Sequence, residues 1–524
     1  MSPETKLEQV PIENDEEIPY LQNPVYDEYP FGKTVYFETY GCQMNVNDAE
    51  YAWAVLQNAG FKKTDSYLMA DVILLVTCSI REKAEDKIWN RLAFLKTLKR
   101  KQPGKGFPKL GILGCMAERL KKKIVEQEKA VDIVAGPDAY RDLPRLLEQA
   151  TSESTTAINV MLSVDETYAD IMPVRMDELS KTAFVSIMRG CENMCSYCIV
   201  PFTRGLERSR PVESIVNEIK QLSDQGIKQV TLLGQNVNSY RDLSEVQHKP
   251  TPEDVAPMSK GFKTIYKPRL GGLRFAYLLD RVSQIDSEMR IRFMSPHPKD
   301  FPDEVLHLIS ERPNICNHIH LPAQSGSTKV LEAMRRGYSR EDYLNLVDRI
   351  RHLIPDVSLS TDMITGFCSE DEIDHQDTLS LLNLVKYNFA FLFKYSMRKK
   401  THAYHKMKDD VSQEVKGQRL AEIMEIYQQK LVEVNSQCLG TNQLVLIEKP
   451  LQKNPDVLMG RTDGGLKTFI PNSPIPTSVN SQDTILPKPG DYVAAKLTSY
   501  KPNSFRAQPL HLSSIKSFYS TGSR

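Results

Sequence analysis

The run GCENMCSYCIVPFTRG places three cysteines, Cys191, Cys195 and Cys198, at C-x3-C-x2-C spacing. Thiolates bind zinc and iron–sulfur clusters, and a closed structural or electron-transfer site usually has four protein ligands. Three thiolates can hold three irons of a four-iron cluster and leave the fourth iron open to a substrate or cofactor. A zinc knuckle completed by a distant His or Cys is the alternative, but this run lacks a second CxxC and follows a strand-like segment. The spacing therefore favours a cluster that binds a small molecule.

Three more cysteines, Cys42, Cys78 and Cys115, each end a short β-rich apolar run. They are 36 and 37 residues apart, about one strand–helix unit, and the stretches between them have helical periodicity. Such units form a parallel sheet, in which the carboxyl ends of the strands lie along one edge. One buried cysteine in a strand is usually structural. Three at the same position of successive units instead predict a second cluster, again with an open iron.

The composition limits the class of protein. The 524 residues are enough for several domains. Nine cysteines without an apolar signal segment argue for reduced thiols that bind metal or do chemistry, and against a disulfide framework. No stretch approaches the roughly 18 to 20 apolar residues that cross a bilayer, so we expect no membrane association. Residues 1–32 are expected to be a disordered acidic leader without the arginine-rich pattern of a mitochondrial transit peptide.

Six strand-like runs alternate with amphipathic helical stretches between residues 183 and 398. This alternation predicts a partial (β/α)6 barrel over residues 177–410, with functional residues at the carboxyl ends of its strands. His297, which lies between two prolines at one such end, could be a general acid or a metal ligand, although a loop histidine held by prolines is more often structural. The cysteines without ligand spacing are expected not to bind metal. They are Cys316, Cys368 and Cys438.

Residues 243–270 interrupt this repeat with proline and charge, and they are expected to form an inserted surface loop. Its basic side chains could contact RNA, although a solvated loop is the favoured interpretation. They are Lys260, Lys263, Lys267 and Arg269.

A linking helix is expected over residues 411–437 and a small β-barrel over residues 438–515, where short strands are separated by glycine turns. Residues 438–524 carry ten basic and five acidic side chains, although the whole chain has 67 of each sign. This local excess predicts contacts with phosphate, with scattered surface lysines as the alternative. The candidate residues are Lys449, Arg461, Lys467, Lys496 and Arg506.

The two sets of cysteines together resemble the methylthiotransferase branch of the radical S-adenosylmethionine enzymes. The motifs GCQMN, LLGQNVNSY and HLPAQSGS are similar to those of the class that modifies isopentenyladenosine in tRNA. This resemblance covers nearly the whole chain from about residue 34. It implies an α/β fold with a flavodoxin-like N-terminal domain at 33–150, a radical SAM barrel and a C-terminal TRAM domain that binds RNA.

The same resemblance implies two 4Fe-4S clusters, one on each set of three cysteines, and S-adenosyl-L-methionine. Tyr197 matches a position near the cofactor's adenine, Gln235 one near its amino group and Gly366 one near its adenosyl group. Gly366 lies in the run TDMITGFCSE, which has Cys368-Ser369 where the family is expected to have Pro-Gly. The turn after Gly366 therefore departs from the pattern. No side chain is assigned as a catalytic acid or base.

The implied reaction is methylthiolation of the C2 carbon of isopentenyladenosine next to the anticodon. One cofactor molecule would methylate sulfur at the strand-end cysteines, and a second, cleaved at the triplet, would yield the radical that removes the C2 hydrogen. The expected partners are the tRNA anticodon stem-loop, an electron donor and a sulfur donor. The run YSMRKKTHAY and the insert resemble the animal branch, which adds a kinase regulatory subunit as a possible partner.

Two other functions stay open, namely methylthiolation of threonylcarbamoyl-adenosine in tRNA and noncatalytic binding of a kinase regulator. The compartment is open as well. The resemblance implies a mitochondrial enzyme, since related members act on mitochondrial tRNA, whereas the lack of a visible transit pattern favours the cytoplasm.

Overall fold

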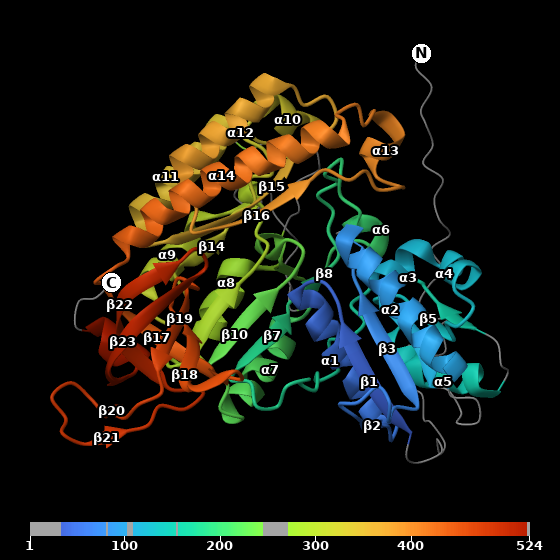
Figure 1. Ribbon diagram of the computed structural model, residues 1–524, viewed down its shortest axis with the longest axis horizontal. Coiled ribbons are helices and arrows are strands. Elements are labelled where there is room, and N and C mark those ends of the chain that lie inside the picture. Colours follow the sequence, from blue (N-terminus) through green and yellow to red (C-terminus); the bar gives the residue numbers. More distant parts are fainter. Residues whose placement is uncertain are drawn as a thin grey trace. The chain divides into compact units, whose positions relative to one another are not determined.

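The computed structural model describes residues 33–79, 82–101, 108–152, 156–244, 262 and 271–520 (Figure 1). They form two compact units. Unit 1 contains the residues up to Met176 together with Thr203–Gly205, and unit 2 contains Asp177–Phe202 and the residues from Leu206 onward. The predictions for the acidic leader and for the four basic residues of the insert lie outside the described residues.

Unit 1 is built on a parallel sheet with the strand order β2-β1-β3-β4-β5-β6. Helices follow most of the strands, which is the doubly wound arrangement that the strand–helix intervals predicted. The strands are β1 (Thr34–Thr39), β2 (Lys62–Lys63), β3 (Val72–Thr77), β4 (Lys109–Gly114), β5 (Ile133–Ala135) and β6 (Ala157–Asn159). The helices are α1 (Gln43–Asn58), α2 (Glu82–Lys101), α3 (Cys115–Leu120), α4 (Lys122–Gln127) and α5 (Leu143–Ser152).

Side chains of β3 are buried on both faces of this sheet. Leu74 belongs to one hydrophobic cluster, and its neighbours Ile73 and Leu75 belong to a second cluster. Because successive side chains of a strand point to opposite faces, both faces must be covered. The strand order reverses between β1 and β3, which is the position where open parallel sheets place ligands, outside the carboxyl ends of the strands.

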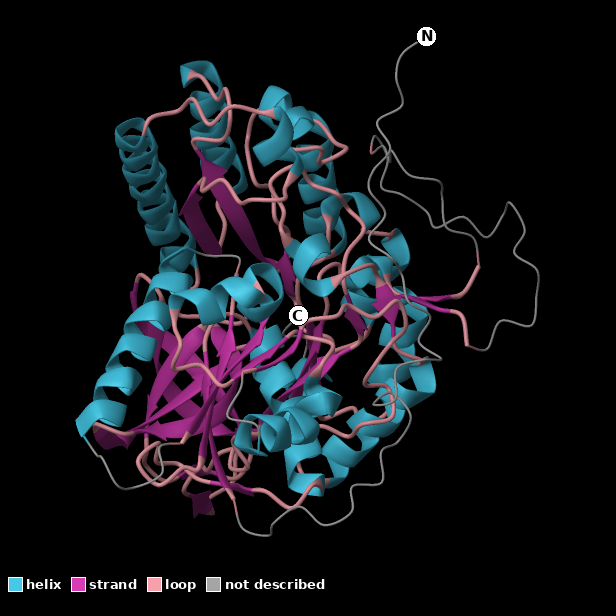
Figure 2. Ribbon diagram, turned by 90° about the vertical axis from the view of Figure 1, so that its right-hand side faces the viewer, coloured by secondary structure: helices cyan, strands magenta, loops and turns pink. Residues whose placement is uncertain are grey.

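Unit 2 begins with six strands that correspond to the six predicted runs. Three form the sheet β13-β10-β7 and three form the sheet β14-β15-β16, and a parallel bridge from Ile291 to Ile315 joins the two groups. The partial barrel is thereby confirmed, and Figure 2 shows helices on the outside of its strands. The strands are β7 (Thr182–Ser186), β10 (Gln229–Leu233), β13 (Arg290–Phe293), β14 (His318–His320), β15 (Ser358–Thr365) and β16 (Phe389–Lys394). The covering helices include α7 (Val212–Asp224), α8 (Phe275–Ser283), α9 (Asp303–Glu311), α11 (Arg340–Leu353) and α12 (Glu372–Val385).

Three residues of the insert are described. Leu243 and Ser244 are exposed, as expected for a surface loop, but Phe262 is not. Phe262 is 6% exposed, and its ring centroid lies 5.2 Å from that of Tyr338 in the main core of unit 2. The inserted segment therefore contributes a side chain to the core, which the expectation of a surface loop did not include.

After the long helix α14 (Gln413–Gln437), the chain forms a closed barrel with the strand order β17-β18-β19-β23-β22. The expected β-barrel is confirmed. The runs with a strand pattern, QLVLIEK, LKTFIP and YVAAKLTSY, lie in β17, β19 and β22, whereas β18 and β23 were not predicted. The strands are β17 (Asn442–Leu451), β18 (Asn454–Arg461), β19 (Lys467–Pro471), β22 (Tyr492–Lys501) and β23 (Ser504–Ser513).

Two buried arginines of β13 attach the closed barrel to the rest of unit 2. Arg290 donates to the main-chain oxygens of Arg461 and Leu444 at 2.8 and 2.6 Å, and Arg292 donates to that of Thr462 at 2.7 Å. These are charge-assisted hydrogen bonds to main-chain carbonyls, which are stronger than neutral ones.

Among the described helices, none is long and apolar enough to cross a membrane.

Candidate functional site

The triplet loop, Cys191–Cys198, is a tight turn held by its own backbone. The main-chain nitrogen of Cys198 donates to the oxygen of Cys195 at 2.9 Å, and the nitrogen of Asn193 lies 3.5 Å from the sulfur of Cys191. Gly190 enters the loop at a φ of +73°, which glycine adopts without strain. Burial raises the pKa of the Cys198 thiol to about 12 and raises that of Cys191 as well. The loop gathers three thiols that need a bound metal to be held as thiolates.

Arg336 contacts this loop and was not predicted from the sequence. Its Nη1 lies 3.5 Å from the sulfur of Cys195, while Nε donates to the Tyr338 hydroxyl at 2.9 Å and Nη2 to the Pro322 oxygen at 2.8 Å. The side chain is 5% exposed. Its positive charge lowers the pKa of the Cys198 thiol, against the larger opposite effect of burial.

Gln235 follows strand β10, as predicted, and its side chain has an unsatisfied acceptor. Its Oε1 is buried and has no hydrogen-bond partner among the described residues. A buried acceptor without a donor costs free energy, on the order of 1 to 3 kcal/mol. The atom is therefore suited to accept a hydrogen bond from an amino group of a ligand.

Tyr197 and Gly366 are brought into the same neighbourhood. Tyr197 packs against the hydrophobic cluster that contains Phe367 and Cys368, the two residues after Gly366. Gly366 has a φ of +72°, and a Cβ there would lie 2.3 Å from the Cγ of Lys416. No larger residue fits this position without displacing the lysine. The main chain at Gly366 therefore passes close to the Lys416 side chain.

The turn after Gly366, which has Cys368-Ser369 in place of the expected Pro-Gly, is stabilised by hydrogen bonds with distant residues. Ser369 has a φ of +58°, and both its nitrogen and its hydroxyl donate to Asp410, at 2.7 and 3.0 Å. Glu370 is buried, accepts from the Gly366 nitrogen at 2.8 Å and pairs with Arg419 at 3.0 Å. These contacts hold the strained residue in the left-handed region and fix the position of Gly366.

His297 has the structural role that was the favoured interpretation. Its ring Nδ1 accepts from the Lys299 nitrogen at 3.3 Å, and its own main-chain nitrogen donates to the Asn236 side chain at 2.9 Å. Burial, with Arg336 and Lys299 nearby, holds the pKa of His297 well below its usual value. The imidazole is therefore neutral and caps the short turn Pro298–Asp300.

The strand-edge site consists of Cys42, Cys78 and Cys115, which sheet register brings together. Thr77 of β3 pairs with Gly114 of β4, so Cys78 and Cys115 follow paired residues at the same edge. Cys42 is the N-cap of α1, after β1 on the other side of β3. These strand ends border the reversal of strand order between β1 and β3.

Gly41 allows this close approach. A Cβ there would lie 2.6 Å from the Cβ of Cys78 and 3.3 Å from its sulfur, and the residue has a φ of +114°. Both the space and the backbone conformation therefore require glycine. Any residue with a Cβ at position 41 would collide with Cys78 at this edge of the sheet.

Three polar residues that the sequence did not single out surround the strand-edge site. Arg204 donates to the Asp48 carboxylate at 2.6 Å and to the Asn45 side-chain oxygen at 3.0 Å. The same Asn45 oxygen lies 4.0 Å from the sulfur of Cys42. Burial raises the pKa of the Cys115 thiol to about 12, and the charge of Arg204 opposes this shift. The signal in the sequence was only a lone arginine in PFTRG.

Within the described part of the chain, no three or more His, Cys, Asp or Glu side chains are arranged to hold a single metal ion. A four-iron cluster makes a different demand, because each thiolate binds its own iron. Sets of three thiols beside a glycine cradle, or on a tight loop with an arginine, fit that donor chemistry. The expectation that the other three cysteines do not bind metal stays a prediction. Cys316 and Cys368 are buried, and Cys438 ends α14.

The barrel β17–β23 places several of the predicted RNA-binding residues in one row. Lys449 pairs with Met459, Met459 with Phe469, and Phe469 with Arg506, across four strands. Residues opposite each other in neighbouring strands project from the same face. Lys467 lies on this face as well, with its Nζ 5.2 Å from the Phe469 ring centroid. The row combines basic side chains with an aromatic ring, as nucleic-acid surfaces do.

The other two candidates contribute differently. Arg461 pairs across the strands with Lys467 and so lies on the same face, but its ion pair with Glu448 at 3.0 Å partly neutralises its charge. Lys496 is exposed and lies opposite Gln508 on β23. The predicted set is therefore brought together only in part.

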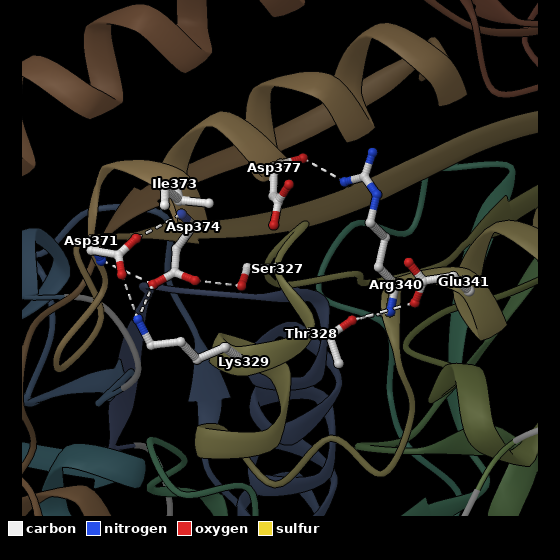
Figure 3. Close-up of a pocket in the computed structure, with 9 residues that line it drawn as sticks. All are labelled: Ser327, Thr328, Lys329, Arg340, Glu341, Asp371, Ile373, Asp374 and Asp377. Atoms are coloured by element: carbon white, nitrogen blue, oxygen red, sulfur yellow. Dashed lines mark hydrogen bonds and ion pairs between the residues drawn. The ribbon is translucent and has the colours of Figure 1, made fainter.

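A polar pocket lies near the start of α12 (Figure 3). Lys329 bridges Asp371 and Asp374 at 2.7 and 2.8 Å, and Ser327 donates to Asp374 at 2.6 Å. None of the predicted site residues lines this pocket. Its charges are largely satisfied by one another, as in a surface ion-pair network.

Comparison with known proteins gives three regional matches. Residues 34–136 match an uncharacterized protein family, UPF0004, residues 185–382 match the radical SAM superfamily, and residues 436–510 match the TRAM domain. The chain is 59% identical over 92% of its length to the mitochondrial tRNA methylthiotransferase CDK5RAP1 of Mus musculus, of which it covers 82%.

More distant relatives include a bacterial enzyme. The chain is 48% identical over 84% of its length to the tRNA-2-methylthio-N(6)-dimethylallyladenosine synthase of Chloroherpeton thalassium, of which it covers 90%. Among solved structures it is similar to the radical S-adenosylmethionine methyltransferase TsrM of Kitasatospora setae, with 13% identity and a TM-score of 0.49. That match covers 79% of this chain and 81% of the other.

Proposed function

Because this chain belongs to the radical S-adenosylmethionine tRNA methylthiotransferase family, we propose that it methylthiolates the C2 carbon of isopentenyladenosine next to the anticodon. Membership of the radical SAM superfamily implies a 4Fe-4S cluster and S-adenosylmethionine, and the N-terminal family region implies a second cluster. The proposal assigns these groups to residues and names the substrate.

The arrangement of six cysteines in two groups of three carries the proposal. Cys191, Cys195 and Cys198 would hold the cluster that binds S-adenosylmethionine, and the strand-edge site would hold the auxiliary cluster. When bound at the triplet loop, the cofactor supplies a radical that can remove hydrogen from an unactivated C–H bond. The unpartnered oxygen of Gln235, the ring of Tyr197 and the main chain at Gly366 would bind its amino, adenine and adenosyl parts.

The protein's contribution to this chemistry is binding, orientation and exclusion of water. Arg336 contacts the Cys195 sulfur and would compensate the negative charge of a bound cluster. Asp410 and Glu370 accept hydrogen bonds from the main chain of the turn after Gly366 and keep that main chain in place. Neutral His297 is held in a cap, so we assign it no proton transfer.

The tRNA would bind along the row of basic and aromatic residues on the closed barrel. Lys449, Lys467 and Arg506 would contact phosphates, and Phe469 offers a ring for stacking. Lys496 and Arg461 would add charge beside this row. The anticodon stem-loop is the proposed recognition element, because the modified adenosine lies there. An electron donor and a sulfur donor are required as further partners.

Two relatives support the choice of substrate and compartment. The mouse relative is named as a mitochondrial enzyme that acts on tRNA, and the bacterial one as a synthase for the dimethylallyl form of adenosine. We therefore infer isopentenyladenosine in mitochondrial tRNA over threonylcarbamoyl-adenosine. A role in binding a kinase regulatory subunit would be secondary to the enzymatic activity.

The test has two parts. Anaerobically reconstituted protein should contain about eight irons per chain, and about four in either triple alanine variant of the two cysteine sets, by cluster stoichiometry. Mass spectrometry of tRNA nucleosides from cells without the gene should show loss of 2-methylthio-isopentenyladenosine. Unchanged levels in both the mitochondrial and the cytoplasmic tRNA would contradict the substrate, and loss of the threonylcarbamoyl derivative would favour the alternative.

A further inference from the structure

Arg204 is a buried positive charge at the strand-edge site. Thr203–Gly205 belong to unit 1, although the chain on either side of them belongs to unit 2. The Arg204 side chain is 4% exposed and its partner Asp48 is fully buried. This short return of the chain therefore delivers one guanidinium into the N-terminal unit.

The distance from this guanidinium to the sulfur of Cys42 has an upper limit, because both groups contact the same oxygen of Asn45. The Asn45 Oδ1 lies 3.0 Å from the Nη2 of Arg204 and 4.0 Å from the sulfur of Cys42. The nitrogen and the sulfur therefore lie no more than about 7 Å apart, the sum of those two distances. Asn45 also donates to the Tyr40 oxygen at 2.6 Å, which fixes it against the end of β1.

A buried Arg–Asp pair is a poor way to stabilise a fold. Removing two charges from water costs several kcal/mol per ion, and an apolar pair of similar volume is often at least as stable. The pair is better explained by a need for charge at this place. A four-iron cluster with two positive charges on its oxidised core and three thiolates is negative overall, and reduction adds one more negative charge.

We propose that Arg204 is the charge-compensating residue of the auxiliary cluster at Cys42, Cys78 and Cys115, with Asp48 limiting its effect and Asn45 linking it to the Cys42 loop. This inference rests on the proposed function, since it requires a cluster at the strand-edge site. A positive charge stabilises the more negative, reduced state of the cluster, so Arg204 raises the midpoint potential.

The test uses the full-length chain in which Cys191, Cys195 and Cys198 are alanine, so that only the auxiliary cluster assembles. Its one-electron potential is measured by titration with dithionite, followed by electron paramagnetic resonance. In Arg204→Gln the equilibrium constant for reduction of the cluster should fall by a factor of ten or more. For one electron, a tenfold change lowers the midpoint potential by about 59 mV. Arg204→Lys should shift it less, and Asp48→Asn should shift it in the opposite direction, to higher potential.

A matched control exists in unit 2. Arg210 is 3% exposed and pairs with Glu218, which is 1% exposed, at the same 2.6 Å as the Arg204–Asp48 pair. Arg210→Gln breaks an equivalent buried pair and should leave the potential unchanged. Equal shifts in Arg204→Gln and Arg210→Gln, or shifts of the same sign in Arg204→Gln and Asp48→Asn, would overturn the assignment. If Arg204→Gln loses its iron, Asp48→Asn decides: a rise supports the assignment and no change overturns it.

Failure of this inference can be told apart from failure of the proposed function. If the wild-type chain holds two clusters and makes the methylthio product, but the Arg204 and Asp48 variants keep the wild-type potential, only the role of Arg204 is wrong. If the chain with the triplet removed binds no cluster, the auxiliary site itself is wrong, and the role of Arg204 falls with it.

Discussion

The triplet loop and the strand-edge site each contain three cysteines, but the fold brings each set together in a different way. In the triplet loop the cysteines lie within eight residues, and a local hydrogen bond from Cys198 to Cys195 shapes the turn. In the strand-edge site they are 36 and 37 residues apart, and only the pairing of three parallel strands brings them together. The first site depends on a loop, whereas the second depends on the whole sheet.

The difference lies in what must be correct before a cluster can bind. A loop site forms once a short segment is in place, while a site at a sheet edge forms only when register is correct across several units. Both sites nevertheless recruit a buried arginine from a distant part of the chain, Arg336 in one case and Arg204 in the other. Each site combines three thiols with one fixed positive charge.

The largest expected effect separates the two sites by chemistry. Replacing Cys191, Cys195 and Cys198 by alanine should abolish both cleavage of S-adenosylmethionine and formation of product. Replacing Cys42, Cys78 and Cys115 should abolish the product but keep cofactor cleavage, because the radical is made at the triplet. Chromatography of deoxyadenosine and of tRNA nucleosides measures both. Cofactor cleavage that survives loss of the triplet would break the comparison.

The next effect tests the dependence of the strand-edge site on close backbone approach. In Gly41→Ala the new methyl group would lie 2.6 Å from Cys78, so we expect loss of the auxiliary cluster and a destabilisation of about 2 to 4 kcal/mol. Gly60→Ala is the matched control, since Gly60 also has positive φ, of +86°, but nothing lies within 4 Å of its Cβ position.

The control should cost about 1 kcal/mol and keep the full iron content. Iron analysis and thermal unfolding measure the two quantities. Equal iron loss in both glycine variants would mean that backbone conformation alone, and not the contact with Cys78, accounts for the effect.

An intermediate effect concerns the proposed RNA-binding row on the closed barrel, which is separate from both cysteine sites. Lys467→Gln and Arg506→Gln should each weaken tRNA binding several-fold and reduce the slope of log K against log salt by about one. The iron content and cofactor cleavage should not change. Lys488→Gln, at an exposed lysine outside the five strands, is the control. Filter binding at several salt concentrations measures the slope, and an equal loss in the control would remove the row from consideration.

The smallest effect is a response to pH at the turn after Gly366. Hydrogen bonds from the Ser369 nitrogen and hydroxyl hold the pKa of Asp410 below its usual value. A lowered folded-state pKa gives stability that is present above the unfolded value, about 4, and is lost as the pH falls through the folded value. The protection factor of the Ser369 amide, which corrects its exchange rate for the intrinsic pH dependence, should fall below about pH 4, and Asp410→Asn should lack this response. The amide of Cys78 serves as the reference. An equal fall in protection at Cys78 would mean that the whole chain, and not the turn, responds.

Much of the fold was predictable because its signals are local or periodic. Six apolar runs in unit 2 became the six strands of the barrel, and the intervals between Cys42, Cys78 and Cys115 gave the parallel sheet of unit 1. Strands β18 and β23 were missed because polar residues dilute their apolar pattern, as at Asn454 and Asp456 in β18 and at Arg506 and Gln508 in β23. Each nevertheless pairs with the strand just before it in the chain.

The sites were predictable only as far as the cysteines themselves. Arg204 reaches Asp48 across 156 positions and Arg336 reaches Cys195 across 141, and no sequence pattern marks such pairs. The sequence shows that Ser369 stands where the family is expected to have glycine, but Asp410, which stabilises this turn by hydrogen bonds, lies 41 positions away. What escaped the sequence was the set of polar contacts between distant segments.

The attachment of the closed barrel has a consequence for how the protein can diverge. Arg290 and Arg292 donate to main-chain oxygens of residues 444, 461 and 462, and every amino acid has such an oxygen. Two barrel side chains also belong to the joint, since the Tyr492 hydroxyl donates to the main-chain oxygens of Lys228 and Glu288 and the Asp463 carboxylate accepts from the Asn317 nitrogen. The other side chains on the barrel can change through mutation while the joint is kept. Recognition of new RNA shapes can evolve on its outer surface without altering the angle at which that surface is held to the catalytic part of unit 2.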